Sequence, residues 1–491
     1  MDPTYLAIDL GAASGRAILG AFDGVRLKLN EIHRFQNGGI SIGDDLYWDI
    51  LRLWEEIKRG ICLAHENAGS SLRSVGMDTW GVDFGLLAGD DTLIGNPYHY
   101  RDKRTDDILE KAFSLVPQEE IYQHTGIQFM QINSLYQLLS MVLMNTPALS
   151  ISETFLNIPD LFNFFLTGRK ANEFTISTTT QCYNPRENQW DFDLLAVFGI
   201  PTNIFGEIIQ PGIVLGALRE SVAREVGSSR LSVIASAGHD TACAVAAVPT
   251  ASPDYLYISS GTWSVMGAEL GHPLINAASM EANMTNEGGV ENTYRFLTNI
   301  MGLWLVQECR RQWNREGTDY SYTELTEMAA DAPAFGPLIV TGQSRFLAPV
   351  NMPKTIQSFC QETRQTVPVE KGAIIRCVLE SLALEYRWVA EQIDRLIGKH
   401  FPVIHIIGGG SKNKLLNQFT ANSTGRTVIT GPAEATAVGN ILVQAIAMGD
   451  ISSLTEGRGI VKKSFDVDIY EPEDTSVWDQ AYQRYLALKM L

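Results

Sequence analysis

The chain has 491 residues, of which 56 are Asp or Glu and 38 are Lys or Arg, so the formal net charge is −18. The length predicts about two to four domains, and the apolar fraction of 45% with a charged fraction of 19% excludes a disordered chain. The charge argues against a broad nucleic-acid or anionic-membrane surface, because such surfaces need cationic side chains. It leaves room for a small anion site built from backbone N–H groups.

Targeting segments and cysteine motifs are not recognisable in the sequence. No basic segment followed by an apolar one stands at the N-terminus, and no apolar run approaches the roughly 20 residues of a membrane-spanning helix. The six cysteines form no C-x-x-C motif, which argues against a zinc site. We expect a cytoplasmic protein with reduced thiols, and the sequence leaves open whether Cys360 and Cys377 pair.

The first recognisable element is a strand, a turn and a second strand near the start of the chain. An apolar run at residues 5–8 ends at Asp9, small residues follow at 11–15, and a second apolar run covers 16–22. Neither a Walker loop nor a dinucleotide fingerprint is present. Asp9 could hold Mg²⁺ through water and Arg16 could pair with a phosphate. A turn-forming acid and a solvated surface charge are the alternatives.

Two polar and aromatic clusters follow, at residues 78–84 and 100–105. Sugar sites combine aromatic faces with fixed polar groups, so Trp80 and the charges of the second cluster suit a polyol ligand. A core tryptophan and a solvated helix start are the simpler interpretations. Asp78 and Asp83 could form a glycosidase pair, but nothing in their spacing supports it.

The best candidate for a catalytic base lies in the segment Ser-Ala-Gly-His-Asp-Thr at residues 236–241. Strand-like residues precede it at 233–235, and small apolar residues at 241–248 predict a buried helix. A carboxylate at such a junction can accept a proton from a bound hydroxyl, so Asp240 is the candidate base. A helix N-cap and a metal ligand remain alternatives. A hydrolase dyad with His239 is less favoured because no G-x-S-x-G elbow accompanies it.

A second copy of the first motif begins 250 residues later, where Leu-Tyr-Ile-Ser-Ser-Gly at 256–261 aligns with Leu-Ala-Ile-Asp-Leu-Gly at 6–11. Similarity at about half the chain length predicts two related domains. The stretch 246–253 contains two prolines and small residues and is typical of a domain junction. We therefore expect domains at 1–249 and 250–491, with the last helix able to pack back on the first domain.

The second half supplies a candidate helix at residues 298–311. Asn299 and Gln307 are two turns apart in that helix, so they would lie on roughly one face. Ordinary helix packing explains the pattern equally well.

A strand, a glycine-rich turn and a helix follow near the C-terminal end. A β-branched run covers 403–407, glycines occupy 408–410, and Ser411 is the candidate N-cap of a helix over 412–424. A further strand and helix are expected over 426–448. Three glycines let a backbone approach a ligand closely, although a tight turn without a ligand is the other interpretation. Together these elements predict α/β domains with mixed sheets.

Eight segments in chain order over about residues 4–470 resemble the FGGY family of carbohydrate kinases, namely AIDLGAASGR, GMDTWGVDF, YRDKRT, IPDLFNFFLTG, GHDTACAV, SSGTWSVMG, NIMGLWLVQECRRQW and IIGGGSKNKLLNQ. DTWGVDF and NIMGLWL are most similar to the members that phosphorylate L-rhamnulose. The resemblance implies two actin-like, ribonuclease-H-like α/β domains around a central nucleotide and sugar cleft. It implies transfer of the ATP γ-phosphoryl group, with Mg²⁺, to the 1-hydroxyl of L-rhamnulose in L-rhamnose catabolism.

The resemblance also assigns residues, with Asp240 matching the family's general base. The positions that match nucleotide contacts are Ala12, Ala13, Ser14, Gly15, Arg16, Thr262, Gln307, Gly408, Gly409 and Gly410. The positions that match sugar contacts are Gly81, His239, Asp240, Thr241 and Asn299. Ala13 stands where the family often has Ser, which removes a hydroxyl but keeps the backbone donors, so we expect activity. Asp9 remains the metal candidate, through water.

Other functions are weighed against this one. L-Fuculose, L-xylulose and L-ribulose are alternative ketoses, since related kinases differ through few sugar contacts. A non-enzymatic actin-like filament subunit would not need Asp240 in a base position, a chaperone would need an appended peptide-binding domain, and a silent sugar sensor should lack the base or the phosphate turn. We expect a ketose and ATP as partners, no nucleic acid or membrane, and a monomer or small homo-oligomer.

Overall fold

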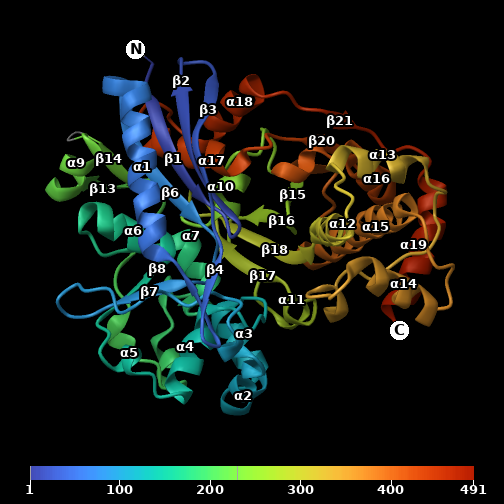
Figure 1. Cartoon of the computed structure of the whole chain (residues 1–491), viewed down its shortest axis with the longest axis horizontal. Coiled ribbons are helices and arrows are strands. Elements are labelled where there is room, and N and C mark those ends of the chain that lie inside the picture. The colour runs from blue at the N-terminus through green and yellow to red at the C-terminus, as the bar shows by residue number, and fades with distance from the viewer. Residues whose placement is uncertain (1, 229–230) are drawn as a thin grey trace. The chain divides into compact units, whose positions relative to one another are not determined.

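In the computed structural model of the protein, residues 2–228 and 231–491 are described, and they form two compact α/β units (Figure 1). The first unit comprises the chain up to Ala251, Glu269–Phe296 and Ala435–Phe465, and the second comprises Ser252–Ala268, Leu297–Glu434 and Asp466–Leu491. The chain first changes units two residues beyond the expected junction. It returns to the first unit for a long segment late in the sequence.

The first unit is built on a six-stranded mixed sheet with the strand order β3-β2-β1-β6-β14-β13. Its strands are β1 (Thr4–Leu10), β2 (Ser14–Phe22), β3 (Leu27–Gln36), β6 (Leu72–Thr79), β13 (Ile213–Ala217) and β14 (Ser232–Ala235). The central strand β1 pairs antiparallel with β2 and parallel with β6, and β6 pairs parallel with β14. Strand β1 is buried along its whole length, because helices cover both faces of the sheet.

Two helices from opposite ends of the sequence cover this sheet, α1 (Ile50–Ala68) and α17 (Ala435–Ala447). Gly60 of α1 approaches Ile8, whereas Gly20 of β2, opposite Tyr5, approaches Ile441 of α17. Positions 5 and 8 of one strand point to opposite faces, so the two helices lie on opposite sides. Helix α17 therefore completes the core of the first unit although it is encoded near the C-terminus.

The second unit repeats the strand order of the first. Its sheet has seven strands in the order β17-β18-β16-β15-β19-β20-β21. The edge strand β17 (Thr285–Gly288) belongs to the first unit, and the other six match the strand order of the first sheet. They are β15 (Tyr255–Ser260), β16 (Trp263–Leu270), β18 (Tyr294–Met301), β19 (Val403–Ile407), β20 (Thr427–Thr430) and β21 (Ile469–Tyr470), of which β16 ends and β18 begins in the first unit. As β1 does with β2 and β6, β15 pairs antiparallel with β16 and parallel with β19. The 250-residue sequence repeat thus corresponds to a repeated sheet topology.

The helices of the second unit pack on one another around the long helix α15. They are α12 (Trp304–Arg315), α13 (Tyr322–Asp331), α14 (Met352–Glu362), α15 (Lys371–Ile397), α16 (Lys414–Thr424) and α19 (Thr475–Lys489). The last helix, α19, packs against α15 and α16 within this unit. The segments that return to the first unit are instead α17 and α18 (Leu454–Ser464).

The remaining elements belong to the first unit. The helices are α2 (Ile108–Leu115), α3 (Gln118–Thr125), α4 (Ser134–Leu143), α5 (Pro147–Ser150), α6 (Ile158–Thr167), α7 (Phe174–Ser177), α8 (Phe192–Val197), α9 (Glu220–Val226), α10 (Asp240–Ala246) and α11 (Ala277–Glu281). The short strands are β4 (Gly39–Ile42), β5 (Asp45–Trp48), β7 (Phe84–Leu87), β8 (Thr154–Asn157), β9 (Asn172–Glu173), β10 (Tyr183–Asn184), β11 (Gln189–Trp190), β12 (Ile208–Ile209) and β17 (Thr285–Gly288). All six cysteines are free thiols.

Three local expectations differ from the structure. Strand β2 already begins at Ser14, so the first turn is shorter than expected. Asn299 lies in strand β18 and not on a helix, because α12 begins only at Trp304. The N-cap of α16 is Asn413 and not Ser411, because a 3₁₀ turn at residues 409–412 precedes the helix.

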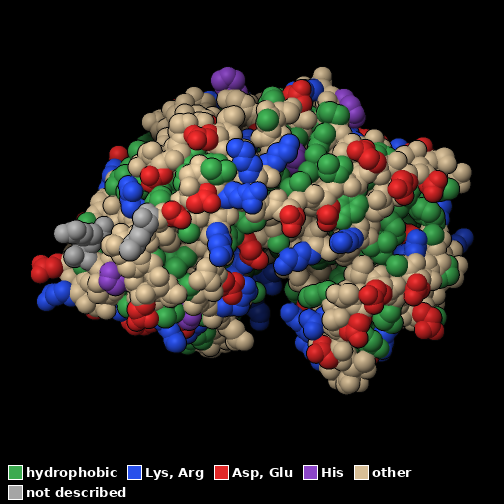
Figure 2. All heavy atoms as spheres, turned by 90° about the horizontal axis from the view of Figure 1, so that it is seen from above, with side chains coloured by type: hydrophobic (Ala, Val, Ile, Leu, Met, Phe, Trp, Pro, Cys, Tyr) green, Lys and Arg blue, Asp and Glu red, His purple; other side chains and the backbone are tan. Residues whose placement is uncertain are grey.

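The surface is of mixed charge in spite of the net charge of −18. Figure 2 shows acidic and basic side chains interspersed over one face, with hydrophobic side chains between them. Over the part of the chain that the structure describes, every helix is too short or too polar to span a membrane.

Candidate active site

The first predicted phosphate turn joins β1 and β2. Its backbone is fixed by a hydrogen bond of 3.0 Å from Gly11 N to Ser14 O and by Asn37, whose side-chain amide donates to Gly11 O at 2.8 Å. Asp9 and Arg16 are opposite each other in the two strands, and the Arg16 guanidinium donates to the Asp9 carboxylate. The turn therefore places backbone donors and one cation next to a buried acid.

A second acid lies beside Asp9, because β1 and β6 pair in parallel and bring Asp78 directly opposite it. Asp78 is fully buried and accepts a hydrogen bond of 2.6 Å from the Asn440 amide of α17. Burial, followed by the negative charge of Asp9, raises the pKa of Asp78 well above its usual range, and Asp240 adds to the effect. Three carboxyl groups thus share one region, and Asp78 is the most deeply buried of them.

The segment with the candidate base is anchored on both sides by backbone hydrogen bonds. Thr79 N donates to Gly238 O at 2.8 Å, and Gly238 N donates to the buried carboxylate of Glu173 at 2.9 Å. Helix α10 begins at Asp240, so this residue lies at the strand-to-helix junction predicted from the sequence. Its side chain is 33% exposed, and Thr241 Oγ1 donates to its Oδ1 at 3.1 Å. Asp240 is therefore fixed in place and still accessible to a ligand.

Four of the five predicted sugar contacts come together in the first unit. His239 Nε2 lies 3.4 Å from Asp240 Oδ1, and a Cβ atom at Gly81 would lie 3.4 Å from the same nitrogen. Thr241 bonds to Asp240 as described above. The fifth predicted contact, Asn299, belongs to the second unit.

The loop that follows Gly81 is held in an unusual conformation. Val82 has a φ of 70°, which is unfavourable for a β-branched residue. Its N–H donates to Thr179 Oγ1 at 3.2 Å, and its carbonyl accepts from Ser134 Oγ at 2.5 Å. Strain of this kind persists only where surrounding contacts impose it, and it is frequent at ligand sites.

The suggestion that Trp80 offers an aromatic face to a sugar is wrong. Trp80 is 5% exposed and stacks on Trp48 with ring centroids 3.9 Å apart. Both indole N–H groups donate to Asp83, which also accepts from Gln137. Trp80 is therefore a core residue, and Asp83 is the acceptor that joins this cluster.

The predicted nucleotide contacts of the second unit gather at the end of β15. Thr262 Oγ1 donates to Gln307 Oε1 at 3.2 Å, which joins the β15–β16 turn to helix α12. The glycine turn after β19 lies against the same strand end, since a Cβ atom at Gly410 would approach Ser260 Oγ to 2.0 Å. Gly408 has a φ of 83°, which favours glycine. The strand ends thus place a hydroxyl, an amide and a side-chain-free turn together.

Several polar residues that support the site were not predicted from the sequence. They are Glu173, Thr179, Glu287, Arg295 and Asn440. A signal existed for Arg295, because a lone arginine in the apolar strand β18 has to be paired once it is buried. The others have partners that are distant in sequence, so no local pattern marks them.

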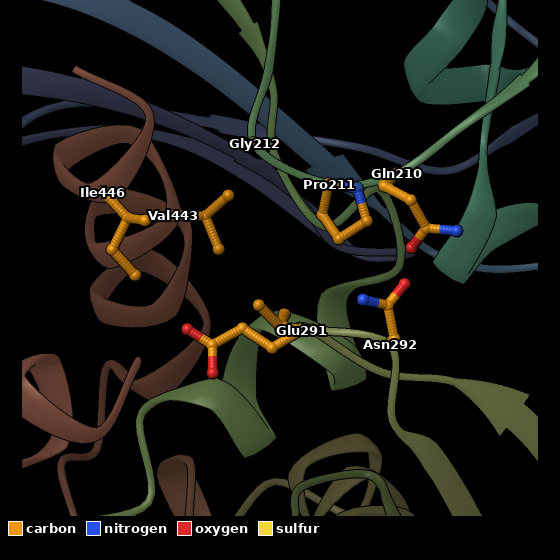
Figure 3. A pocket seen from close by; sticks show the side chains of 8 residues that line it. Gln210, Pro211, Gly212, Glu291, Asn292, Val443 and Ile446 are labelled. Carbon is orange, nitrogen blue, oxygen red and sulfur yellow. The ribbon is translucent and has the colours of Figure 1, made fainter. Parts of the chain in front are cut away.

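A separate hollow in the first unit contains none of the predicted site residues (Figure 3). It is lined by Gln210, Pro211, Gly212, Val290, Glu291, Asn292, Val443 and Ile446. Glu291 accepts a hydrogen bond of 2.7 Å from Leu454 N, so its carboxylate is engaged in the fold. Among the described residues, no three His, Cys, Asp or Glu side chains are grouped as a metal cluster.

The repeated sheet topology, with an acid at a strand end in the first unit and a glycine turn at a strand end in the second, defines the class of the protein as a two-unit α/β protein, and solved structures share its fold. A ligand-bound xylulose kinase from Lactobacillus acidophilus has a TM-score of 0.82 at 18% identity, covering 99% of this chain and 98% of that one. A glycerol kinase from Plasmodium falciparum with ADP has a TM-score of 0.79 at 14% identity, with coverage of 99% and 98%. The fold is therefore the two-domain actin-like, ribonuclease-H-like fold.

The family follows from the sequence comparisons. The N-terminal domain model of the FGGY family of carbohydrate kinases matches residues 4–247, and the C-terminal model matches 256–448. A rhamnulokinase from Bacteroides thetaiotaomicron is 43% identical, covering 98% of each chain. A rhamnulokinase from Oceanobacillus iheyensis is 42% identical, covering 96% of this chain and 98% of that one. The chain belongs to the FGGY family of carbohydrate kinases, and the predicted family, fold class and sugar-kinase activity are confirmed.

Proposed function

We propose that this kinase transfers the γ-phosphoryl group of ATP to the 1-hydroxyl of L-rhamnulose, giving L-rhamnulose 1-phosphate and ADP. The observation that supports L-rhamnulose as the substrate is the identity of 37–43% to several rhamnulokinases over nearly the whole chain. The reaction would serve L-rhamnose catabolism in the cytoplasm. The arrangement of His239, Asp240 and Gly81 supports the site.

Asp240 is the base in this proposal. Its carboxylate accepts the proton of the sugar hydroxyl as the oxygen lone pair forms a bond to the γ-phosphorus. The bond between that phosphorus and the β,γ-bridging oxygen breaks, and ADP leaves with the electron pair. Exposure of 33% lets Asp240 reach the hydroxyl, while the bond from Thr241 fixes one of its oxygens. Gly81, His239, Thr241 and Asn299 would hold the sugar.

The nucleotide contacts are the turn at residues 12–16, Thr262, Gln307 and the glycines at 408–410. Backbone N–H groups of such turns bind phosphate without adding formal charge, which is compatible with a protein of net charge −18. Asp9 would hold Mg²⁺ through water, since a carboxylate oxygen suits this ion and Mg²⁺ keeps much of its hydration shell. When bound, the ion would neutralise phosphate charge. Arg16 lies beside Asp9 and can pair with a phosphate oxygen.

The decisive experiment is an assay of ADP release over a panel of ketoses with the wild type and Asp240→Asn. We expect turnover on L-rhamnulose to fall at least about 100-fold in Asp240→Asn, because the proton acceptor is lost, while ATP binding persists. Asp331→Asn, at the exposed end of α13, is the matched control and should retain activity.

The possible outcomes test the identity of the ketose and the kinase activity separately. A strong preference for L-fuculose, L-xylulose or L-ribulose would replace the substrate and keep the kinase. Equal turnover by Asp240→Asn would remove this residue as the base. The absence of ketose-dependent ADP release with every sugar would contradict the proposal as a whole.

A further inference from the structure

A buried ion pair lies directly behind His239. Arg295 of β18 is fully buried, and its Nη2 lies 3.1 Å from Glu287 Oε2 of β17. Its Nε donates to Gly288 O at 2.8 Å. A buried arginine requires a countercharge, and the contacts of Nε with Gly288 O and of Nη2 with Glu287 and His239 hold this guanidinium in one orientation, whereas Nη1 has no hydrogen-bond partner among the described residues.

The contact of Arg295 Nη2 with His239 determines which ring nitrogen of the imidazole carries the proton. Arg295 Nη2 forms a hydrogen bond of 3.1 Å with His239 Nδ1. A guanidinium is always protonated and has no acceptor atom, so it must be the donor. Nδ1 therefore supplies its lone pair, and the neutral imidazole carries its proton on Nε2.

The carboxylate of Glu287 is the competitor in this arrangement. Its Oε2 lies 3.2 Å from His239 Nδ1 and would accept a proton from that nitrogen if one were present. Burial alone would raise the pKa of Glu287, but Arg295 and then His239 lower it below its usual value. Glu287 is thus an anion that neutralises Arg295, and removal of Arg295 would leave it to attract a proton onto Nδ1.

The other ring nitrogen faces the proposed sugar site. His239 Nε2 lies 3.4 Å from Asp240 Oδ1 and next to the side-chain-free position Gly81. An N–H at this point can donate to an oxygen of a polyhydroxy ketone. A bare nitrogen would instead compete with Asp240 for the hydroxyl proton.

We propose that Arg295, neutralised by Glu287, is a positioning residue that fixes His239 as the Nε2–H tautomer and directs this N–H to a ketose oxygen beside Asp240. The ligand chemistry in this inference rests on the proposed function, whereas the tautomer does not. His239 and Asp240 then have different roles at the site, because His239 donates a hydrogen bond to the ketose and Asp240 accepts the hydroxyl proton.

The test is a long-range ¹H–¹⁵N correlation spectrum of the full-length protein labelled with ¹⁵N-histidine. The chain has eight histidines, so the His239 signals can be assigned by their loss in His239→Asn. In the wild type we expect a protonated-type shift at Nε2 and a lone-pair-type shift at Nδ1. An Nδ1–H pattern, or an imidazolium at pH 8, would overturn the proposal even if every variant failed to fold.

Variants of the ion pair sharpen the test. In Arg295→Met we expect the proton to move to Nδ1, facing Glu287, and the KM for the ketose to rise about tenfold as one hydrogen bond is lost, with the KM for ATP unchanged. Glu287→Gln should retain the Nε2–H pattern, because Arg295 still donates to Nδ1. Arg395→Met, on the exposed side of α15, controls for the loss of an arginine and should match the wild type.

Failure of this inference can be distinguished from failure of the proposed kinase function. The tautomer of the free protein is measured without substrate, so an Nε2–H pattern that moves in Arg295→Met supports the inference whichever ketose is phosphorylated. An unchanged His239 spectrum in folded Arg295→Met would overturn it while leaving the kinase assay unaffected.

Discussion

Asn440 donates a hydrogen bond of 2.6 Å to Asp78, a residue 362 positions earlier in the chain. The Asn440 amide oxygen accepts a hydrogen bond from Gln444. Gln444 also donates to Leu6 O and accepts from the hydroxyl of Ser74. All four side chains are fully buried. Helix α17 is thus joined to β1 and β6 by a polar network within an apolar core.

This network leads to a stability prediction. Asn440→Leu should lower the free energy of unfolding by about 2 kcal/mol, because it leaves buried acceptors and donors without partners. Asp78→Asn should cost less, since burial raises the pKa of Asp78 well above its usual range and a neutral amide suits the same buried site. Urea unfolding at pH 7 measures both, and a larger loss for Asp78→Asn would contradict the prediction.

Asp83 should make stability depend on pH between about 4 and 6. Burial raises its pKa from 3.8 to about 6, although hydrogen bonds from Gln137, Trp48 and Trp80 oppose this. The folded protein therefore binds this proton more tightly than the unfolded chain, so its contribution is greatest at low pH and is lost as the pH rises. The loss is about 3 kcal/mol.

The measurement is the difference in unfolding free energy between the wild type and Asp83→Asn at several pH values. Between pH 4 and pH 7, the wild type should lose about 2 kcal/mol of unfolding free energy relative to Asp83→Asn, which is most of the full effect. Asp331→Asn, at an exposed aspartate, should show no such change. A difference that is flat over this range would exclude a raised pKa.

The contact between α10 and α17 should not tolerate a methyl group. A Cβ atom at Gly439 would lie 1.8 Å from the carbonyl oxygen of Cys243, so Gly439→Ala must move the helices apart. We expect a loss of about 3 kcal/mol. Gly459 in α18 faces open space, and Gly459→Ala should stabilise the protein by up to about 1 kcal/mol. Comparable thermal melts for the two variants would contradict this account.

The glycine turn of the second unit offers a test of close ligand approach. A Cβ atom at Gly409 would meet no other atom, whereas one at Gly410 would clash with Ser260. If the nucleotide contacts this backbone, Gly409→Ala should raise the KM for ATP about tenfold without changing the melting temperature. Gly410→Ala should lower the melting temperature. An unaltered KM for ATP in Gly409→Ala would remove Gly409 from the nucleotide contacts.

Local patterns predicted the elements whose side chains favour one structure. The β-branched run at residues 403–407 is strand β19 with the predicted bounds, and the motif at 5–22 is a hairpin. The error at Asn299 arose because Ile300, Met301 and Leu303 suit a helix as well as a buried strand. Which one forms depends on pairing within the sheet, and a short sequence window does not contain that information.

The site was predictable only where one segment carries it. His239, Asp240 and Thr241 are consecutive, so their grouping was visible in the sequence. Arg295 acts on His239 from 56 positions away, and its partner Glu287 lies on another strand. Such pairs are set by the register of the strands and not by local spacing, so supporting residues escape sequence reasoning more often than the base does.

The late return of the chain to the first unit has a consequence for synthesis. Helix α17 covers Gly20, Gly76 and Asp78, and it is translated after nearly all of the second unit. During translation, the face of the first sheet that α17 covers therefore stays exposed until residues 435–465 have left the ribosome. We expect the order of folding to differ from the order of translation, with the first half of the chain among the last parts to become resistant to protease.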